Sequence, residues 1–186
     1  MGSSGITVLL HYLTERPETA GLASAILNKT DFPGYGYFIA QDETTWPEDW
    51  KIDVPSKIHT CYTGIAGWFT KGLCGIQPDK DKVGYKHFIV KPFIVAEVDF
   101  AEASVGSPYG EIVSRWEHKN NKITLSVTVP PNTSARVYIP TSQPEQVTES
   151  GRKLNASEGV AFECAENGYV VVEATSGKYE FVSPYN

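Results

Sequence analysis

The spacing of the apolar side chains changes once along this chain, near residue 84. Before that point apolar residues recur at intervals of three and four, which is typical of a helix with one buried face. Beyond it they alternate with polar residues, which is typical of a strand with one buried and one solvated face. The sequence therefore predicts a segregated α+β chain, with helices in residues 1–83 and strands in residues 84–186.

The first part of the chain predicts three helices. Pro17 is expected to open the second helix, because proline is tolerated in a first turn and not in a helix interior. The Gly-rich stretch before the third helix is read as a loop, and that helix is expected to end near Gly72 or Gly75. The apolar side chains expected to face a core are Val8, Leu9, Tyr12, Leu13, Leu22, Ala25 and Ile26 in the first two helices, and Ile58, Tyr62, Ile65, Trp68 and Phe69 in the third.

The second part of the chain predicts about eight short strands separated by turn residues. Such a series indicates an antiparallel β-sandwich or jelly roll, with Trp116 in its core. Turns are expected at Asn120-Asn121, Pro130-Pro131-Asn132, Glu166-Asn167-Gly168 and Ser176-Gly177. In the strand "NKITLSVTVP" the side chains expected to face inward are Ile123, Leu125, Val127 and Val129.

Charge and composition limit the partners of the chain. Its net charge is −6 with scattered Lys and Arg, which argues against a nucleic-acid partner and suits a neutral ligand better. No stretch approaches the roughly 18 apolar residues of a membrane span, and the N-terminus lacks the pattern of a signal peptide. No membrane association is therefore expected, and the sequence names no compartment. The three cysteines fit neither a disulfide framework nor a zinc site, so buried thiols and no metal or cofactor are expected.

The stretch "AQDETTWPEDW", residues 40–50, contains four acidic side chains and two tryptophans. A carboxylate can take a proton from water, and the C–H face of a sugar can stack on an indole. The residues alone leave two interpretations open: a solvated acidic loop that happens to carry aromatic side chains, or a site in which a carboxylate acts on a substrate held by indole faces.

Several blocks of the sequence resemble, in order, the C-terminal third of the bacterial α-L-rhamnosidases of glycoside hydrolase family 78. They are "YGYFIAQDETTWPEDW", "SKIHTCYTGIAGWFTKGLCGI", "VGYKHFIVKP", "ASVGSPYGEIVSRW" and "VPPNTSARVYIP", and together they span nearly the whole chain. The resemblance implies that residues 1–83 are the last helices of an (α/α)6 catalytic barrel and that residues 84–186 form a C-terminal β-sandwich domain. The barrel is expected to be incomplete, because a closed ring of roughly 12 helices takes on the order of 190 residues.

The resemblance also implies an inverting glycosidase mechanism with one catalytic residue in this chain. In "DETTWPEDW", Glu48 occupies the position of the general base, and Trp46, Trp50 and His59 are implied to line the sugar subsite. The general acid of the family lies in an upstream segment that has no counterpart here. The implied ligand is a rhamnose-containing glycoside or polysaccharide, and the implied partner is the missing part of the barrel or a second protomer.

The chain departs from the family pattern on both sides of this site. Trp46-Pro47 stands where the family has Ile-Trp, and Ile58-His59-Thr60 stands where it has Asn-His-Tyr, so the substrate specificity could differ. From the residues alone, His59 and the two tryptophans could equally be packing residues. Two hypotheses therefore remain: a fragment of an inverting α-L-rhamnosidase, or a non-catalytic β-sandwich module that buttresses a barrel or binds carbohydrate weakly.

Overall fold

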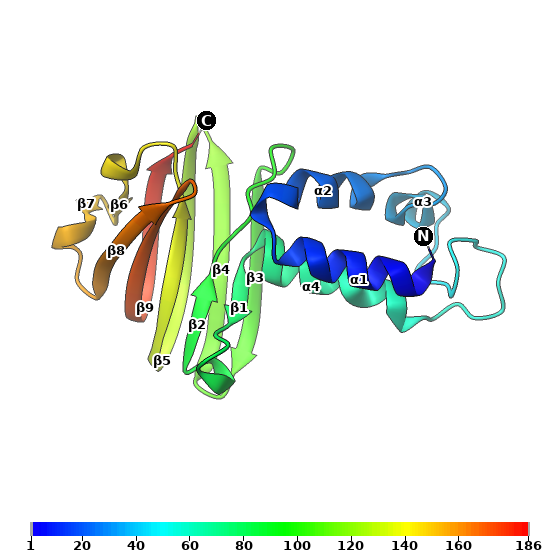
Figure 1. Cartoon of the computed structure of the whole chain (residues 1–186), viewed down its shortest axis with the longest axis horizontal. Coiled ribbons are helices and arrows are strands. Elements are labelled where there is room, and N and C mark those ends of the chain that lie inside the picture. The colour runs from blue at the N-terminus through cyan, green and yellow to red at the C-terminus, as the bar shows by residue number, and fades with distance from the viewer. Residues whose placement is uncertain (1, 186) are drawn as a thin grey trace. The chain divides into compact units, whose positions relative to one another are not determined.

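The computed structural model describes residues 2–185. The chain divides into two compact units, a helical unit up to Gly72 and a sheet unit from Leu73 onward. In Figure 1 the helical unit runs from blue to blue-green and the sheet unit from green to red. The sheet unit begins before residue 84 because its first strand, β1 (Ile76–Pro78), already pairs with β2 (His87–Val90).

The helical unit consists of short helices and single turns. Pro17 opens the second helical segment, as predicted, by starting a 3-10 turn that leads into α2. The helix α3 was not predicted, because its glycines suggested a loop. The elements are α1 (Ser3–Thr14), the 3-10 turn Pro17–Thr19, α2 (Ala20–Asn28), α3 (Tyr35–Ala40), the 3-10 turn Thr60–Thr63, α4 (Gly64–Trp68) and the π turn Phe69–Leu73. Within residues 2–185 every helix is too short or too polar to span a bilayer.

The face predicted to be buried in the first two helices is mostly wrong, since Leu13 is the one residue of the predicted set that is buried. Val8, Tyr12 and Leu22 are exposed by 71%, 51% and 55%, whereas the buried positions are Ile6, Leu10, Leu13, Ala20, Ala23 and Leu27. The reason is that α1 and α2 carry apolar side chains on two faces, and only one of them packs within the unit. In the third helical segment Tyr62, Ile65 and Trp68 are buried as predicted, but Ile58 precedes the helix and Phe69 lies in the wider π turn, so both are exposed.

The sheet unit confirms the predicted fold class with a β-sandwich-like sheet. Its remaining strands are β3 (Phe100–Ser107), β4 (Gly110–Lys119), β5 (Lys122–Pro140), β6 (Thr148–Glu149), β7 (Arg152–Lys153), β8 (Val160–Glu166) and β9 (Tyr169–Pro184). The main order is β1-β2-β5-β9-β6-β7, with β4 also beside β5, β3 beside β4, and β8 beside β9. One pairing departs from the antiparallel prediction, because β2 runs parallel to β5.

Two strands are much longer than predicted. The expected turn at residues 130–132 is a bulge in β5, where the register with β9 shifts between Val129 and Ser134. A bulge admits an extra residue without ending a strand, and Asn132 takes a positive φ of 60° there. Likewise Ser176-Gly177 lies inside β9 rather than between two strands. The first half of β5 pairs with β4 and the second half with β2, while β9 accompanies β5 along both halves.

The core of the sheet unit lies on one face of these strands. The four residues predicted to point inward, Ile123, Leu125, Val127 and Val129, are all buried, which confirms the predicted register. Trp116 is also fully buried, as predicted, and its Nε1 atom donates to the carbonyl of Leu73 at 2.8 Å. Of the three cysteines only Cys74 is a buried thiol; Cys61 is half-buried and Cys164 is exposed, because it lies on the solvated strand β8.

Candidate functional site

The loop of residues 41–59 carries the four residues singled out for the site. It leaves α3 and returns to the 3-10 turn Thr60–Thr63. The backbone N–H of His59 donates to the carbonyl of Trp46 at 2.8 Å, and the N–H of Glu48 donates to the carbonyl of Ser56 at 3.1 Å. The hydroxyl of Thr45 donates to the carbonyl of Lys57 between them. The two ends of the loop therefore run side by side, which brings Trp46 next to His59.

An aromatic cluster supports this loop from within the helical unit. Trp50 is only 7% exposed, and its ring centroid lies 4.6 Å from that of Tyr62, 5.4 Å from that of Phe38 and 5.5 Å from that of Tyr35. Trp46 is half-buried at the edge of the cluster, 5.3 Å from Tyr35. The two tryptophans therefore differ: Trp50 lies inside the cluster, whereas part of Trp46 is open to solvent.

The acidic side chains of the loop differ in their partners. Glu43 forms an ion pair with Lys57 at 3.0 Å, and an oxygen of Asp49 accepts the N–H of Trp50 at 2.6 Å. Glu48 is exposed, and its carboxylate has no hydrogen-bond or ion-pair partner among residues 2–185. Glu48 is therefore free to contact a ligand or a water molecule.

His59 is oriented by the turn that follows it. Its Nδ1 atom accepts the backbone N–H of Cys61 at 3.4 Å, so the side chain caps the turn Thr60–Thr63. When one nitrogen of a neutral imidazole accepts, the other carries the proton. The Nε2 atom of His59 is thus the one that can donate to a ligand.

Three members of the aromatic cluster under the loop were not connected with the loop from the sequence. They are Tyr35, Phe38 and Tyr62. Helical spacing placed Tyr62 in a core, but no signal related it to Trp50, since twelve positions of loop and turn separate them. Burial, followed by the charges of Asp49 and Cys61, raises the pKa of Tyr62 to about 12. Burial is also the main cause that raises the pKa of Tyr35 above its usual value.

We expect the loss of the hydroxyl to have opposite effects on the free energy of unfolding at the two buried tyrosines, Tyr62 and Tyr35. The Tyr62 hydroxyl is buried and has no hydrogen-bond partner among residues 2–185, whereas the Tyr35 hydroxyl donates to the carbonyl of Tyr62 at 3.0 Å. Tyr62→Phe is expected to leave the free energy of unfolding unchanged or raise it by up to about 1 kcal/mol, because an unsatisfied buried group is removed. Tyr35→Phe should lower it by about 1 kcal/mol. Urea denaturation of the two variants compares them, and equal losses would contradict the assignment.

The described residues contain no group of three or more His, Cys, Asp or Glu side chains placed to hold a metal ion. The loop offers a carboxylate without a protein partner, Glu48, together with an indole and an imidazole donor on the same loop. A carboxylate of this kind can accept a proton from water, and the two rings can contact a sugar face and a hydroxyl.

Two family models match the chain, one for each unit. Residues 1–73 match the bacterial alpha-L-rhamnosidase 6 hairpin glycosidase domain. Residues 75–154 match the bacterial alpha-L-rhamnosidase C-terminal domain.

Similar known proteins are also alpha-L-rhamnosidases, and they match a longer stretch of this chain than either family model does. An alpha-L-rhamnosidase of Formosa agariphila is 30% identical over 100% of this chain and 21% of its own length, and one of Streptomyces avermitilis is 30% identical over 97% and 17%. The crystal structure of the Streptomyces avermitilis alpha-L-rhamnosidase complexed with L-rhamnose matches with a TM-score of 0.75 at 30% identity, over 84% of this chain and 15% of that one. The alpha-L-rhamnosidase of Dictyoglumus thermophilum matches with a TM-score of 0.75 at 25% identity, over 87% and 18%. The chain spans about a fifth of the length of these curated relatives.

Proposed function

Because the chain belongs to the bacterial α-L-rhamnosidase family and corresponds to a C-terminal portion of the family's proteins, we propose that it contributes the general-base loop to a glycoside hydrolase that removes terminal α-L-rhamnose. The helical unit, which ends at Gly72 rather than at the expected residue 83, is the end of an (α/α)6 catalytic barrel, and the rest of the chain is the C-terminal β-sandwich domain. The substrate is a rhamnose-containing glycoside or polysaccharide.

The observation that carries this proposal is the state of Glu48. Its carboxylate is exposed and has no partner among residues 2–185, as is also true of Asp42 and Asp53, and it lies in a loop whose paired ends bring Trp46 and His59 together. In an inverting glycosidase one carboxylate takes a proton from water while an acid on the other face of the sugar protonates the leaving oxygen, with the two groups about 6.5 to 9.5 Å apart. Glu48 supplies the base, and the acid comes from the upstream part of the barrel.

The other site residues contact the sugar or support the contact. The open part of the Trp46 ring stacks on the C–H face of the sugar, and His59 donates from Nε2 to a hydroxyl. Trp50 packs against Tyr35 and Phe38, which also contact Trp46, and so holds the loop in place.

The apolar side chains left exposed on α1 and α2 support an upstream partner. Val8, Tyr12 and Leu22 would be covered by further helices of the barrel. Exposed apolar surface of this kind marks a site of association, and an incomplete ring of helices explains why two faces of α1 are apolar. A second protomer is the alternative partner that would cover these apolar side chains.

A chimera tests the proposed role of Glu48. It joins the upstream part of the Streptomyces avermitilis relative to this chain in place of that protein's matching C-terminal portion. Hydrolysis of p-nitrophenyl α-L-rhamnopyranoside by the chimera should fall by about 10²- to 10⁴-fold in kcat on Glu48→Gln, because a positioned base is lost. NMR of the first-formed sugar anomer reports whether the configuration is inverted.

Asp49→Asn is the matched control, since it alters the neighbouring carboxylate, which is already bonded to Trp50. It should retain most of the activity. An inactive parent chimera, or an equal loss in the two variants, would contradict the assignment of Glu48. A Glu48→Gln chimera with full activity would favour the non-catalytic role of this chain.

A further inference from the structure

The strand β5 leaves both of its neighbours, β4 and β9, at the same place. β4 begins at Gly110, but its ladder with β5 begins only at Val113. On the other side, the ladder between β5 and β9 is interrupted between Val129 and Ser134. A bulge bends its strand, leaves its extra residue unpaired and often lies beside a functional site. The start of β4, the bulge of β5 and the middle of β9 therefore stand apart from one another.

A cleft of about 610 Å³ lies at this place. It is lined by residues 110–111 of β4, 128–132 of β5 and 176–178 of β9, and it is called the bulge cleft below. Its volume falls within the range of about 300 to 1,000 Å³ that is usual for small-molecule sites. Val129 and Pro130 are buried and form an apolar floor, whereas the side chains of Glu111 and Lys178 are exposed.

A second cavity extends the bulge cleft along the solvated face of β5. It has a volume of about 260 Å³ and shares Thr128 and Lys178 with the bulge cleft. It continues to Ser126, which lies opposite Glu180 of β9 in the register. Thr128 and Ser126 are two positions apart on one strand, so their hydroxyl groups are on the same face. The two cavities therefore form one groove with hydroxyl groups along its base.

The bulge side of the cleft is tied to the hairpin between β3 and β4. The Nζ atom of Lys86 donates to the carbonyl of Asn132 in the bulge. The same atom lies 5.1 Å from the centroid of the Tyr109 ring, which is next to Gly110 in that hairpin. A cation over an aromatic face is an attractive contact. Lys86 therefore links the two sides of the cleft, so that its shape is present before a ligand binds.

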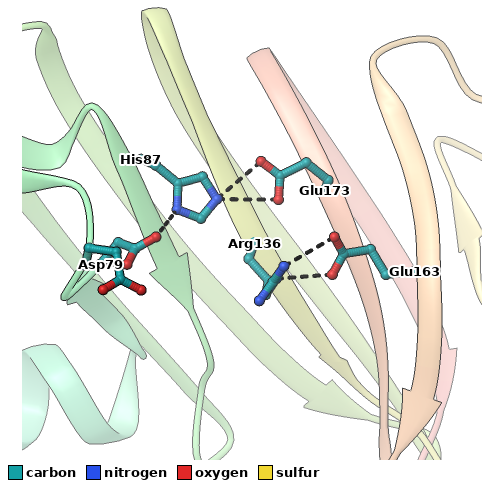
Figure 2. Close-up of polar contacts among 6 residues, drawn as sticks. Asp79, His87, Arg136, Glu163 and Glu173 are labelled. Atoms are coloured by element: carbon teal, nitrogen blue, oxygen red, sulfur yellow. Dashed lines mark hydrogen bonds and ion pairs between the residues drawn. The ribbon is translucent and has the colours of Figure 1, made fainter.

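The other half of the sheet pairs its charged side chains within the protein, as Figure 2 shows. His87 of β2 lies between two carboxylates: its Nδ1 atom is 2.5 Å from an oxygen of Asp79, between β1 and β2, and its Nε2 atom is 3.0 Å from an oxygen of Glu173 of β9. Beside them, the Nε atom of Arg136 on β5 lies 2.9 Å from an oxygen of Glu163 on β8. These charged groups are therefore occupied with one another.

The two charged side chains of the bulge cleft are not paired in this way. Within residues 2–185, neither Glu111 nor Lys178 has a side-chain hydrogen bond or an ion pair. They line the same cleft from strands on opposite sides of β5, and they lie too far apart to form an ion pair with each other. A carboxylate only accepts hydrogen bonds and an ammonium group only donates them. The cleft therefore presents an acceptor on one wall and a donor on the other, above an apolar floor.

A saccharide fits these three features together. Each of its hydroxyl groups both donates and accepts, so one neutral ligand can satisfy Glu111 and Lys178 at once. Its C–H groups can meanwhile contact Val129 and Pro130. An apolar ligand would cover both charges without pairing them, which is costly. A simple cation or anion would satisfy only one of the two walls.

We propose that the bulge cleft is a saccharide-binding site, in which Glu111 accepts from sugar hydroxyl groups and Lys178 donates to them. All of its residues belong to the sheet unit, so it is a different site from the loop of residues 41–59. The identity of the ligand as a rhamnose-containing glycan rests on the proposed function. In that case the cleft holds a stretch of the polysaccharide from which terminal rhamnose is removed.

Titration of the isotope-labelled full chain with rutinose, a neutral disaccharide of L-rhamnose and glucose, tests the site by amide NMR. The signals of residues 110–111 and 176–178 are expected to shift with the sugar concentration, which gives a dissociation constant. Maltose, a disaccharide of glucose alone, is the comparison sugar. Shifts of these signals with rutinose alone would support the cleft and its rhamnose-containing ligand. Equal shifts with maltose would support a saccharide site and contradict rhamnose as what it recognises.

Substitutions on the two walls test the contacts. Glu111→Ala is expected to raise the dissociation constant for rutinose by about tenfold, because charge-assisted hydrogen bonds to the sugar are lost. Lys178→Ala should act in the same direction. Glu166→Ala is the matched control, since it removes an exposed carboxylate of β8 that lies outside the cleft, and it should leave the dissociation constant unchanged.

Three results would overturn the proposal. The first is a titration in which rutinose and maltose shift none of the signals of the cleft. The second is a dissociation constant that is the same in Glu111→Ala and the wild type, and the third is an equal loss of affinity in Glu166→Ala. Shifts confined to residues 41–59 would likewise exclude the cleft, but they would leave the proposed function intact.

Discussion

Replacing Trp116 with alanine is expected to lower the free energy of unfolding of the sheet unit by about 4 to 6 kcal/mol. The indole is 0% exposed and lies opposite Leu125 in the register of β4 and β5. Alanine leaves a large cavity at this position. It also leaves the carbonyl of Leu73 without the N–H that donates to it at 2.8 Å. Because a domain is stable by only about 5 to 15 kcal/mol, this loss is enough to unfold a large fraction of the molecules.

Urea denaturation followed by far-UV circular dichroism measures this loss. Trp116→Phe is the matched control, because it keeps most of the side-chain volume while it removes the N–H donor. It should cost about 1 to 3 kcal/mol. An alanine variant that is no less stable than the phenylalanine variant would show that the cavity closes by repacking and that Trp116 is not the centre of this core.

The second large effect concerns activity, and we expect the isolated chain to show no measurable hydrolysis of natural or aryl α-L-rhamnosides. Under the proposed function the acid comes from outside this chain, so in the isolated chain the leaving oxygen would depart unprotonated and the reaction would lose the roughly 10²- to 10⁴-fold that a positioned proton donor gives. The chain also lacks the barrel wall that would orient the sugar, a contribution that reaches about 7 to 11 kcal/mol for well-held reactants. Aryl glycosides have better leaving groups, so they reduce the loss that comes from the absent proton donor but not the loss that comes from the absent barrel wall.

The assay is the release of p-nitrophenol from p-nitrophenyl α-L-rhamnopyranoside by the purified chain, with Glu48→Gln as the control. Turnover above that control would contradict the expectation. It would place an acid within this chain or in a second protomer, and Asp42, Glu43 and Asp49 would be the first positions to substitute.

The fold class followed from the sequence because the hydrophobic period differs between helices and strands. The alternation from Ile123 to Val129 fixed the buried face of β5, since a slip of one residue would expose all four side chains. Strand length could not be predicted in the same way. Pro130-Pro131-Asn132 has the composition of a turn, and only pairing with β9 on both sides turns it into a bulge.

The buried face of α1 was not predictable from its own period. Val8 and Tyr12 have the spacing of a core face, as do Ile6 and Leu10, and the sequence does not say which face meets its neighbours within the unit. The choice depends on the packing of α2 and α4.

The candidate site was predictable in part. The resemblance singled out Glu48, Trp46, Trp50 and His59, and their roles remain predictions. What the sequence could not supply was the pairing of Trp46 with His59 or the cluster around Trp50, because these contacts join residues from three separate segments. The same holds for His87, whose two carboxylates come from the nearby loop and from distant β9.

Because β5 and β9 run through both halves of the sheet, the unit has no internal boundary at which genetic exchange could divide it. A crossover within residues 122–184 that brought in a mismatched sequence would alter a strand on which both halves depend. One half would lose its partner for β4 and the other its partner for β2. Recombination between related genes that keeps both strands matched must therefore have its breakpoints outside residues 122–184.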